Sequence, residues 1–244
     1  MQTTDSNPKS IEAVVRKAGT GFAREIIFIA FALVILPVTL MAMSYPPTII
    51  EQGQAQRIFY VHVPVAWVAL YAPFFSAVAG LLYIFTRSER YDVWSLANAR
   101  LAFLFALGVL PSGMLWGSIE WGTYWRWTDE RLMSFFVLLM TLIGYFLVRW
   151  YTEDPRKQAV YSAVMAIIAS MAAILTWYAI RIVEKPDLHP PPLLSEMSPK
   201  IGQTFWISVL AYHLLFWVLL RISVRQEYFR RVFLRAQAER NESF

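Results

Sequence analysis

Long apolar segments recur along this chain, and they constrain its fold more than any other feature of the sequence. A helix needs about 20 apolar residues to cross a hydrocarbon core that is about 30 Å thick. The segments that approach this length lie at residues 26–43, 63–85, 101–116, 133–148, 159–180 and 205–220. With 57% hydrophobic and 16% charged residues, the chain is too apolar for a soluble domain. We therefore predict an all-α integral membrane protein, a bundle of about six transmembrane helices that forms a single membrane domain of residues 1–244.

The Lys and Arg residues between these segments predict the orientation of the chain. Sixteen of the 22 lie before the first segment, in the second and fourth connectors, or after the last segment. Because positive residues concentrate on the cytoplasmic side of membrane proteins, both termini are predicted to be cytoplasmic. The outer connectors hold only Arg57, Arg126, Arg131, Arg181, Lys185 and Lys200.

The C-terminal tail, residues 221–244, is basic and contains Tyr228, Phe229 and Phe233. This composition predicts a helix that lies on the anionic inner leaflet, and a docking helix for a partner protein is the alternative. The net charge of +5 is spread around the membrane segments, so it indicates contact with membrane lipid and not with nucleic acid.

Two absences from the sequence restrict its chemistry. The chain has no Cys, which excludes disulfides, Cys-ligated metals and C-x-x-C-H haem attachment. It also has no G-x-x-x-x-G-K-[ST] loop, so another chain must supply any step driven by ATP.

The most informative stretch is the Trp-rich segment, residues 116–132. Its charged residues are too costly to bury in lipid, so a loop is predicted at residues 117–131, on the outer face. Anchoring at the membrane boundary explains one or two Trp residues per helix end, whereas four occur here within twelve residues. That density indicates a binding surface made by Trp116, Trp121, Trp125 and Trp127.

The spacing of this segment groups indoles beside a carboxylate in either of two conformations. A helix would place Trp121, Trp125 and Asp129 on one face, and an extended chain would place Trp127 with the last two. Flat rings favour a flat apolar ligand. Guanidinium groups pair with carboxylates at a ligand's edge, and Arg126 and Arg131 are available for this. A porphyrin combines these features.

The three histidines differ in position. His62 and His189 fall on the outer face. Neutral imidazoles are common axial ligands of haem iron, so both residues are candidate ligands. The alternatives are a boundary residue for His62, with Pro64 in the first helical turn, and a spacer loop around His189. His213 lies near the middle of the last segment, where a hydrogen bond to a neighbouring helix is expected, with ligation or proton transfer as the alternative.

These residues resemble the CcmC family of cytochrome c maturation proteins, which handle haem and carry a tryptophan-rich WWD motif. The stretch from Tyr60 to Trp67, YVHVPVAW, is similar to the family's first histidine motif, and Trp121–Trp127, WGTYWRW, resembles the start of its signature. The likeness extends to chain length, the six-segment layout and the order of histidine, Trp-rich loop and histidine. In the family the signature Asp follows the last Trp directly, whereas here Thr128 precedes Asp129.

The resemblance implies that haem b is held transiently and without a covalent bond at the outer face of the bacterial inner membrane. Its iron would be ligated by His62 and His189, and the haem would then pass to the periplasmic haem chaperone CcmE. The resemblance also implies association with the ATP-binding-cassette components CcmA and CcmB and with the small membrane subunit CcmD.

We therefore expect a non-catalytic haem-binding protein. One alternative is an enzyme, either a membrane haem lyase or a quinone-linked b-type cytochrome, with His213 as a deep ligand. Another is a permease subunit, in which the outer Trp residues only anchor helices; the scarcity of charges within the segments argues against it.

Overall fold

The computed structural model describes residues 26, 29, 33–50, 52–182 and 197–242. Within these ranges it contains no strand, and its helices are α3 (Ile35–Ser44), η1 (Gly53–Ala55), α4 (Gln56–Thr86), α5 (Glu89–Trp121), α6 (Glu130–Tyr151), α7 (Pro155–Ile182) and α8 (Pro199–Glu242). The five long α-helices, α4 to α8, are each long and apolar enough to cross a membrane. The prediction of an all-α membrane protein is confirmed; α3 is a shorter apolar helix within the first predicted segment, part of which lies outside the described residues.

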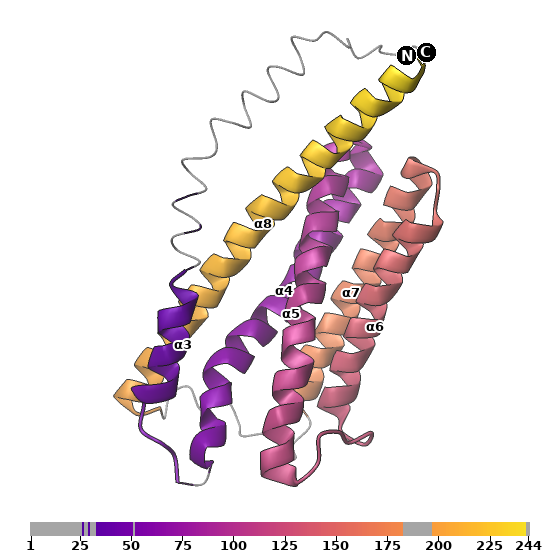
Figure 1. Cartoon of the computed structure of the whole chain (residues 1–244). Helices are drawn as coiled ribbons and strands as arrows, with labels where there is room; N and C mark the ends of the chain where they lie inside the picture. The colour runs from indigo at the N-terminus through magenta and orange to yellow at the C-terminus, as the bar shows by residue number, and fades with distance from the viewer. Residues whose placement is uncertain (1–25, 27–28, 30–32, 51, 183–196, 243–244) are drawn as a thin grey trace.

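Helix α4 lies at the centre of the bundle. It packs against α5, α7 and α8, while α6 packs against α5 and α7, and α3 packs on α8. The turns α4–α5 and α6–α7 lie at the same end as the C-terminus, which we call the tail end (Figure 1). The loop between α5 and α6 and the first residues of α4 and α8 lie at the opposite end, the loop end.

The five long helices share one apolar core. Each contributes fully buried side chains to it, such as Val68, Ala102, Leu138, Ala169 and Phe216. Small residues allow close approach where α4 meets α7: a Cβ added at Gly80 would lie 3.0 Å from the Cα of Ala163. Such contacts favour helix association in lipid, where packing replaces the hydrophobic driving force.

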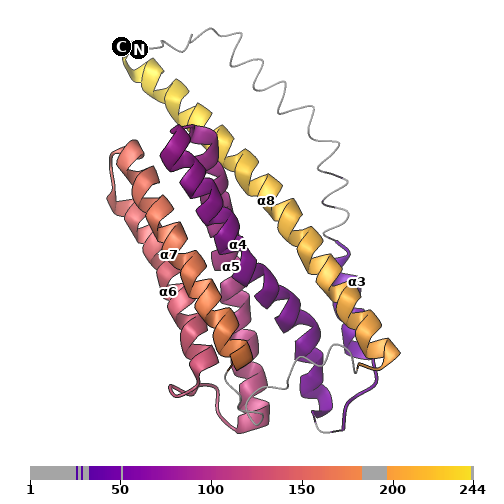
Figure 2. The same ribbon diagram turned by 180° about the vertical axis from the view of Figure 1, so that it is seen from behind.

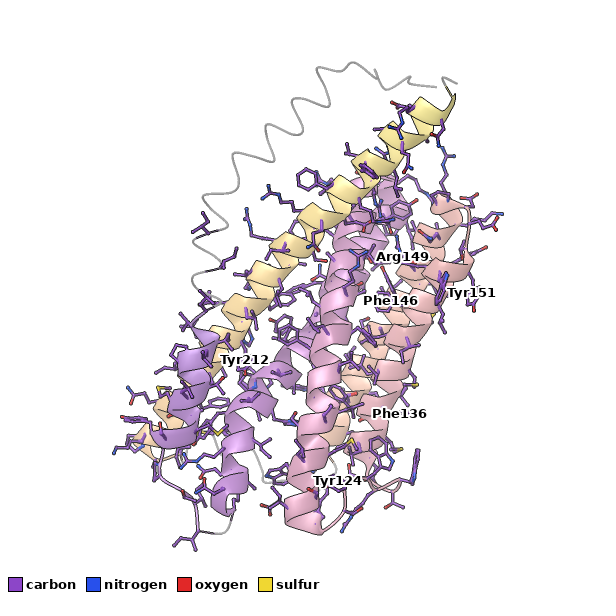
Figure 3. The ribbon with its side chains drawn as sticks, viewed as in Figure 1. Tyr124, Phe136, Phe146, Arg149, Tyr151 and Tyr212 are labelled. Carbon is purple, nitrogen blue, oxygen red and sulfur yellow. The ribbon has the colours of Figure 1, made fainter. Side chains whose placement is uncertain are left out.

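The turn at the tail end between α6 and α7 has a clear helix-start signal. Asp154 precedes Pro155, the first residue of α7, and its carboxylate accepts hydrogen bonds from the N–H groups of Arg156 and Lys157 at 2.7 and 3.1 Å. These backbone donors hold the pKa of Asp154 below its ordinary value. Figure 3 shows α6 running from Phe136 near the loop end to Arg149 and Tyr151 at the tail end.

The C-terminal tail differs from the expectation of a helix lying on the membrane surface. Helix α8 runs unbroken for 44 residues and extends beyond the α4–α5 and α6–α7 turns (Figure 1). At 1.5 Å per residue it is about 66 Å long, about twice the hydrocarbon thickness. Ion pairs hold this extension to the bundle: Arg231 binds Asp92 and Glu89, and Glu227 binds Arg100 at 2.9 Å.

Candidate functional site

His62 lies in the second turn of α4, near the loop end. Because α4 begins at Gln56, Pro64 is its ninth residue, so the expectation that Pro64 occupies the first helical turn is wrong. Pro64 instead leaves the carbonyl of Tyr60 without its helical N–H donor. The His62 side chain is half-buried and faces α5, where its Nδ1 lies 2.8 Å from the hydroxyl of Ser112.

Ser112 contacts its own helix as well as His62. The Ser112 hydroxyl donates to the carbonyl of Gly108 at 2.7 Å and lies 3.0 Å from that of Val109. The Ser112 oxygen is thus held by the backbone of α5 within hydrogen-bond distance of His62 Nδ1. A hydrogen-bond partner at one ring nitrogen is typical of imidazoles that ligate a metal through the other.

Glycine on α5 makes room for this imidazole. A Cβ added at Gly113 would lie 3.2 Å from the His62 Cε1 atom, tighter than ordinary contact. The absence of a side chain at Gly113 thus lets the imidazole lie directly against α5. Trp116 follows Ser112 by four residues, so the two share a face of α5, with Trp116 one turn nearer the loop end.

The Trp-rich segment is more helical than predicted. Helix α5 continues to Trp121 and ends where Gly122 adopts a left-handed conformation at φ 69°, and α6 begins at Glu130. The irregular loop therefore covers residues 122–129 and not 117–131. The segment forms neither the single helical face nor the single extended face considered from the sequence.

Its four indoles form two edge-to-face pairs. In the first, the Trp116 and Trp121 ring centroids are 5.4 Å apart at 85°. Trp121 also lies against Gly117, where an added Cβ would come within 2.9 Å of its ring. The Arg126 guanidinium stands 5.6 Å from the Trp121 ring centroid in a cation–π arrangement. This pair thus carries a positive charge beside an aromatic surface.

The second pair is Trp125 and Trp127, with ring centroids 5.4 Å apart at 73°. Phe136 of α6 supports both rings, at 5.8 and 6.4 Å. The Trp125 Nε1 atom is buried and has no hydrogen-bond partner among the described residues. The Trp127 side chain is 71% exposed. The second pair thus combines an exposed indole, Trp127, with a buried N–H donor on Trp125.

Asp129 has a structural role that the sequence analysis did not anticipate. It is buried and stands at the N-cap of α6, where its Oδ1 accepts from the N–H groups of Arg131 and Leu132 at 3.0 and 2.9 Å. This cap fixes where the loop ends and α6 begins. Arg131 is half-buried in the first turn of α6.

The other two histidines do not join this group in the structure. His189 lies outside the described residues. His213 lies mid-helix in α8, and its Nδ1 bonds to the carbonyl of Val209 of the same helix at 2.7 Å. The expected interhelical hydrogen bond of His213 is thus not found among the described residues. No cluster of three or more His, Asp or Glu side chains that could hold a metal ion occurs in the part of the chain that the structure describes.

The structure therefore brings His62 on α4, the α5 face with Ser112 and Trp116, and the Trp-rich loop to the loop end of the bundle. The sequence analysis missed Ser112, Gly113, Gly117 and Phe136. Gly117 was predictable, because it lies four residues before Trp121 on one helix. Ser112 lies about fifty residues from His62 in the chain, so no local pattern indicates their contact.

These features define a class: multi-pass helical membrane proteins with a histidine and an aromatic loop at one end of the bundle. Residues 7–242 match the family described as "Heme exporter protein C" (CcmC). The chain belongs to this family.

Curated relatives agree with this assignment. The heme exporter protein C of Rhodobacter capsulatus is 30% identical over 203 residues, 81% of this chain and 83% of the relative. That of Paracoccus denitrificans is 30% identical over 74% of this chain and 76% of its own. A putative cytochrome c biosynthesis ccmC-like mitochondrial protein of Marchantia polymorpha is 28% identical over 67% of this chain and 68% of its own.

Proposed function

We propose that this protein binds haem b at the periplasmic face of the bacterial inner membrane and transfers it to the chaperone CcmE during c-type cytochrome biogenesis. The observation that carries the proposal is the position of the His62 imidazole, which contacts Ser112 of α5 through Nδ1 and lies at the same end of the bundle as the Trp-rich loop. Family membership supports haem as the cargo.

In this proposal the iron has two axial ligands. His62 supplies one through Nε2, and His189 supplies the other, as the family resemblance implies. The lack of Cys excludes thioether attachment of haem to this chain, which fits non-covalent binding. Ligation by two imidazoles gives affinity while allowing exchange, since each iron–nitrogen bond breaks in turn when a competing ligand arrives.

The Trp-rich segment supplies shape recognition. Trp121, Trp125 and Trp127 present ring surface to the macrocycle, and Trp127 is the most exposed of them. Arg126, held over Trp121, pairs with a haem propionate, and Arg131 is a second candidate cation. Asp129 acts indirectly by capping α6 and setting the loop conformation.

The partners follow from the same proposal. Haem enters and leaves without a chemical change catalysed by this chain, and energy for release comes from the ATP-binding-cassette components CcmA and CcmB, with CcmD as a small membrane subunit. The absence of a phosphate-binding loop from this sequence fits that division of labour.

Loading of CcmE tests the proposal. His62→Ala and His189→Ala should each abolish transfer of haem to the chaperone, because each removes an axial ligand. Variants that reach the membrane at the parent level, judged by immunoblot, exclude loss through misfolding. Normal loading by both variants would rule out the mechanism.

A further inference from the structure

A second site lies at the middle of the bundle, well away from the Trp-rich loop. It is a cavity of about 440 Å³ lined by residues of α4, α7 and α8. Figure 2 shows α4 running between α7 and α8. This volume falls within the range of about 300 to 1,000 Å³ that is usual for small-molecule sites. Its walls include Trp67, Tyr71, Phe74, Ile174, Trp177 and His213.

The cavity lies near the membrane midplane. Tyr71 is fifteen residues from each end of α4, or about 22 Å at 1.5 Å per residue. Phe74, Ile174 and Trp177 in its walls are 36%, 43% and 43% exposed. On a membrane-spanning surface such exposed apolar side chains face lipid, so the cavity opens sideways to molecules dissolved in the bilayer.

Two polar groups stand in this otherwise apolar wall. The carbonyl of Val209 is only an acceptor, so the His213 Nδ1 atom must donate to it and Nε2 must carry the lone pair. The Tyr71 hydroxyl is buried and has no hydrogen-bond partner among the described residues. The two rings are adjacent, with centroids 5.4 Å apart. One acceptor, the His213 Nε2 atom, and one donor, the Tyr71 hydroxyl, thus lie side by side in the wall of the cavity.

The lining excludes several occupants. Among the described residues it contains no Asp, Glu, Lys or Arg, so the propionates of haem and the headgroup of a phospholipid would be buried there without a counter-charge. A lipid acyl chain would fill the volume but leave the Tyr71 hydroxyl unsatisfied. The walls favour a neutral molecule with a flat ring, because aromatic rings stack in offset or edge-to-face geometry.

We propose that this cavity binds an isoprenoid quinol from the membrane. One ring hydroxyl of the quinol donates to the His213 Nε2 atom and accepts a hydrogen bond from the Tyr71 hydroxyl. The ring lies among Trp67, Phe74 and Trp177, and the isoprenoid tail leaves toward lipid past Ile174. The oxidised quinone has no hydroxyl to donate, so the site prefers the reduced form. This inference does not depend on the haem proposal.

Calorimetric titration of the purified full-length chain with decylubiquinol, against empty detergent micelles, tests the site. Decylubiquinol should bind about tenfold more tightly than decylubiquinone and than decylbenzene, which has the ring and tail without the oxygens. Tyr71→Phe and His213→Leu should each weaken decylubiquinol binding about tenfold. Tyr83→Phe, which removes a hydroxyl from the same helix outside the cavity, is the matched control and should leave the affinity unchanged.

The outcomes separate the possible occupants. Equal affinity for decylbenzene would mean a lipid groove and would overturn the proposal, as would displacement of decylubiquinol by haem at equimolar concentration. Tyr71→Phe should not lower the melting temperature, because it removes a hydroxyl that has no partner. Unchanged affinity in a folded Tyr71→Phe variant would also contradict the proposal.

Discussion

At the residue scale, the proposed haem site depends on a hydroxyl that never touches haem. The Ser112 hydroxyl lies 2.8 Å from His62 Nδ1, and outer-sphere partners of this kind are typically worth about 10- to 100-fold in metal affinity. Ser112→Ala should therefore weaken haem binding by about that factor in a haem titration. Ser118→Ala is the control, since the Ser118 hydroxyl on the same helix donates to the Leu115 carbonyl of its own helix. Equal affinities of the two variants would remove Ser112 from the account.

The exposed indole of Trp127 allows a second comparison. Stacking of aromatic rings contributes about 0.5 to 1.5 kcal/mol beyond area burial, so Trp127→Ala should weaken haem binding up to about tenfold. Trp150→Ala provides the control, because Trp150 is 81% exposed and lies at the tail end of α6, far from the loop. If both changes lowered the affinity alike, the Trp-rich loop would have no special role.

Sequence reasoning at this scale identified the residues whose type or local density is unusual. His62 and the indole cluster stand out by residue type and density, whereas Ser112 and Gly113 act only because α4 and α5 pack side by side. The capping role of Asp129 was predictable, because an Asp directly before a charged first turn and an apolar run is a helix-start signal.

At the element scale, the apolar segments predicted which helices exist but not where they end. Hydropathy falls where lipid ends, yet the backbone continues to satisfy its own hydrogen bonds beyond that point. Helix α4 therefore starts seven residues before the predicted segment, α5 extends five residues beyond it, and α8 continues to Glu242. The extension of α8 depends on ion pairs with α5, which no local pattern reveals.

Asp92 is the centre of those ion pairs, and its loss should destabilise the fold. Its carboxylate is 5% exposed and accepts two hydrogen bonds from Arg149, at 2.7 and 3.1 Å, besides binding Arg231. Breaking a buried pair by removing one partner typically costs about 3 to 5 kcal/mol. Asp92→Ala should lower the melting temperature in detergent markedly, and Glu153→Gln, at an exposed position, should not. A melting temperature equal to that of the parent would show that α8 is held otherwise.

At the scale of the whole molecule, the positive residues predict which end faces the cytoplasm. The structure places the loop end and the tail end at opposite ends of the bundle, as Tyr124 and Tyr151 show in Figure 3. Because the natural chain has no Cys, single cysteines report on each end without background. Tyr124→Cys should react with a membrane-impermeant maleimide in intact spheroplasts, and Glu153→Cys should react only after lysis. The reverse pattern would put the Trp-rich loop in the cytoplasm.

The most direct test of the account is the haem content and absorption spectrum of the purified protein. The parent chain should contain haem, measured as the pyridine complex, with the spectrum of low-spin iron ligated by two imidazoles. His62→Ala, at equal yield and equal melting temperature, should lose most of the haem or show a high-spin spectrum. A low-spin spectrum and full haem content in His62→Ala would contradict the central claim that this imidazole ligates the iron.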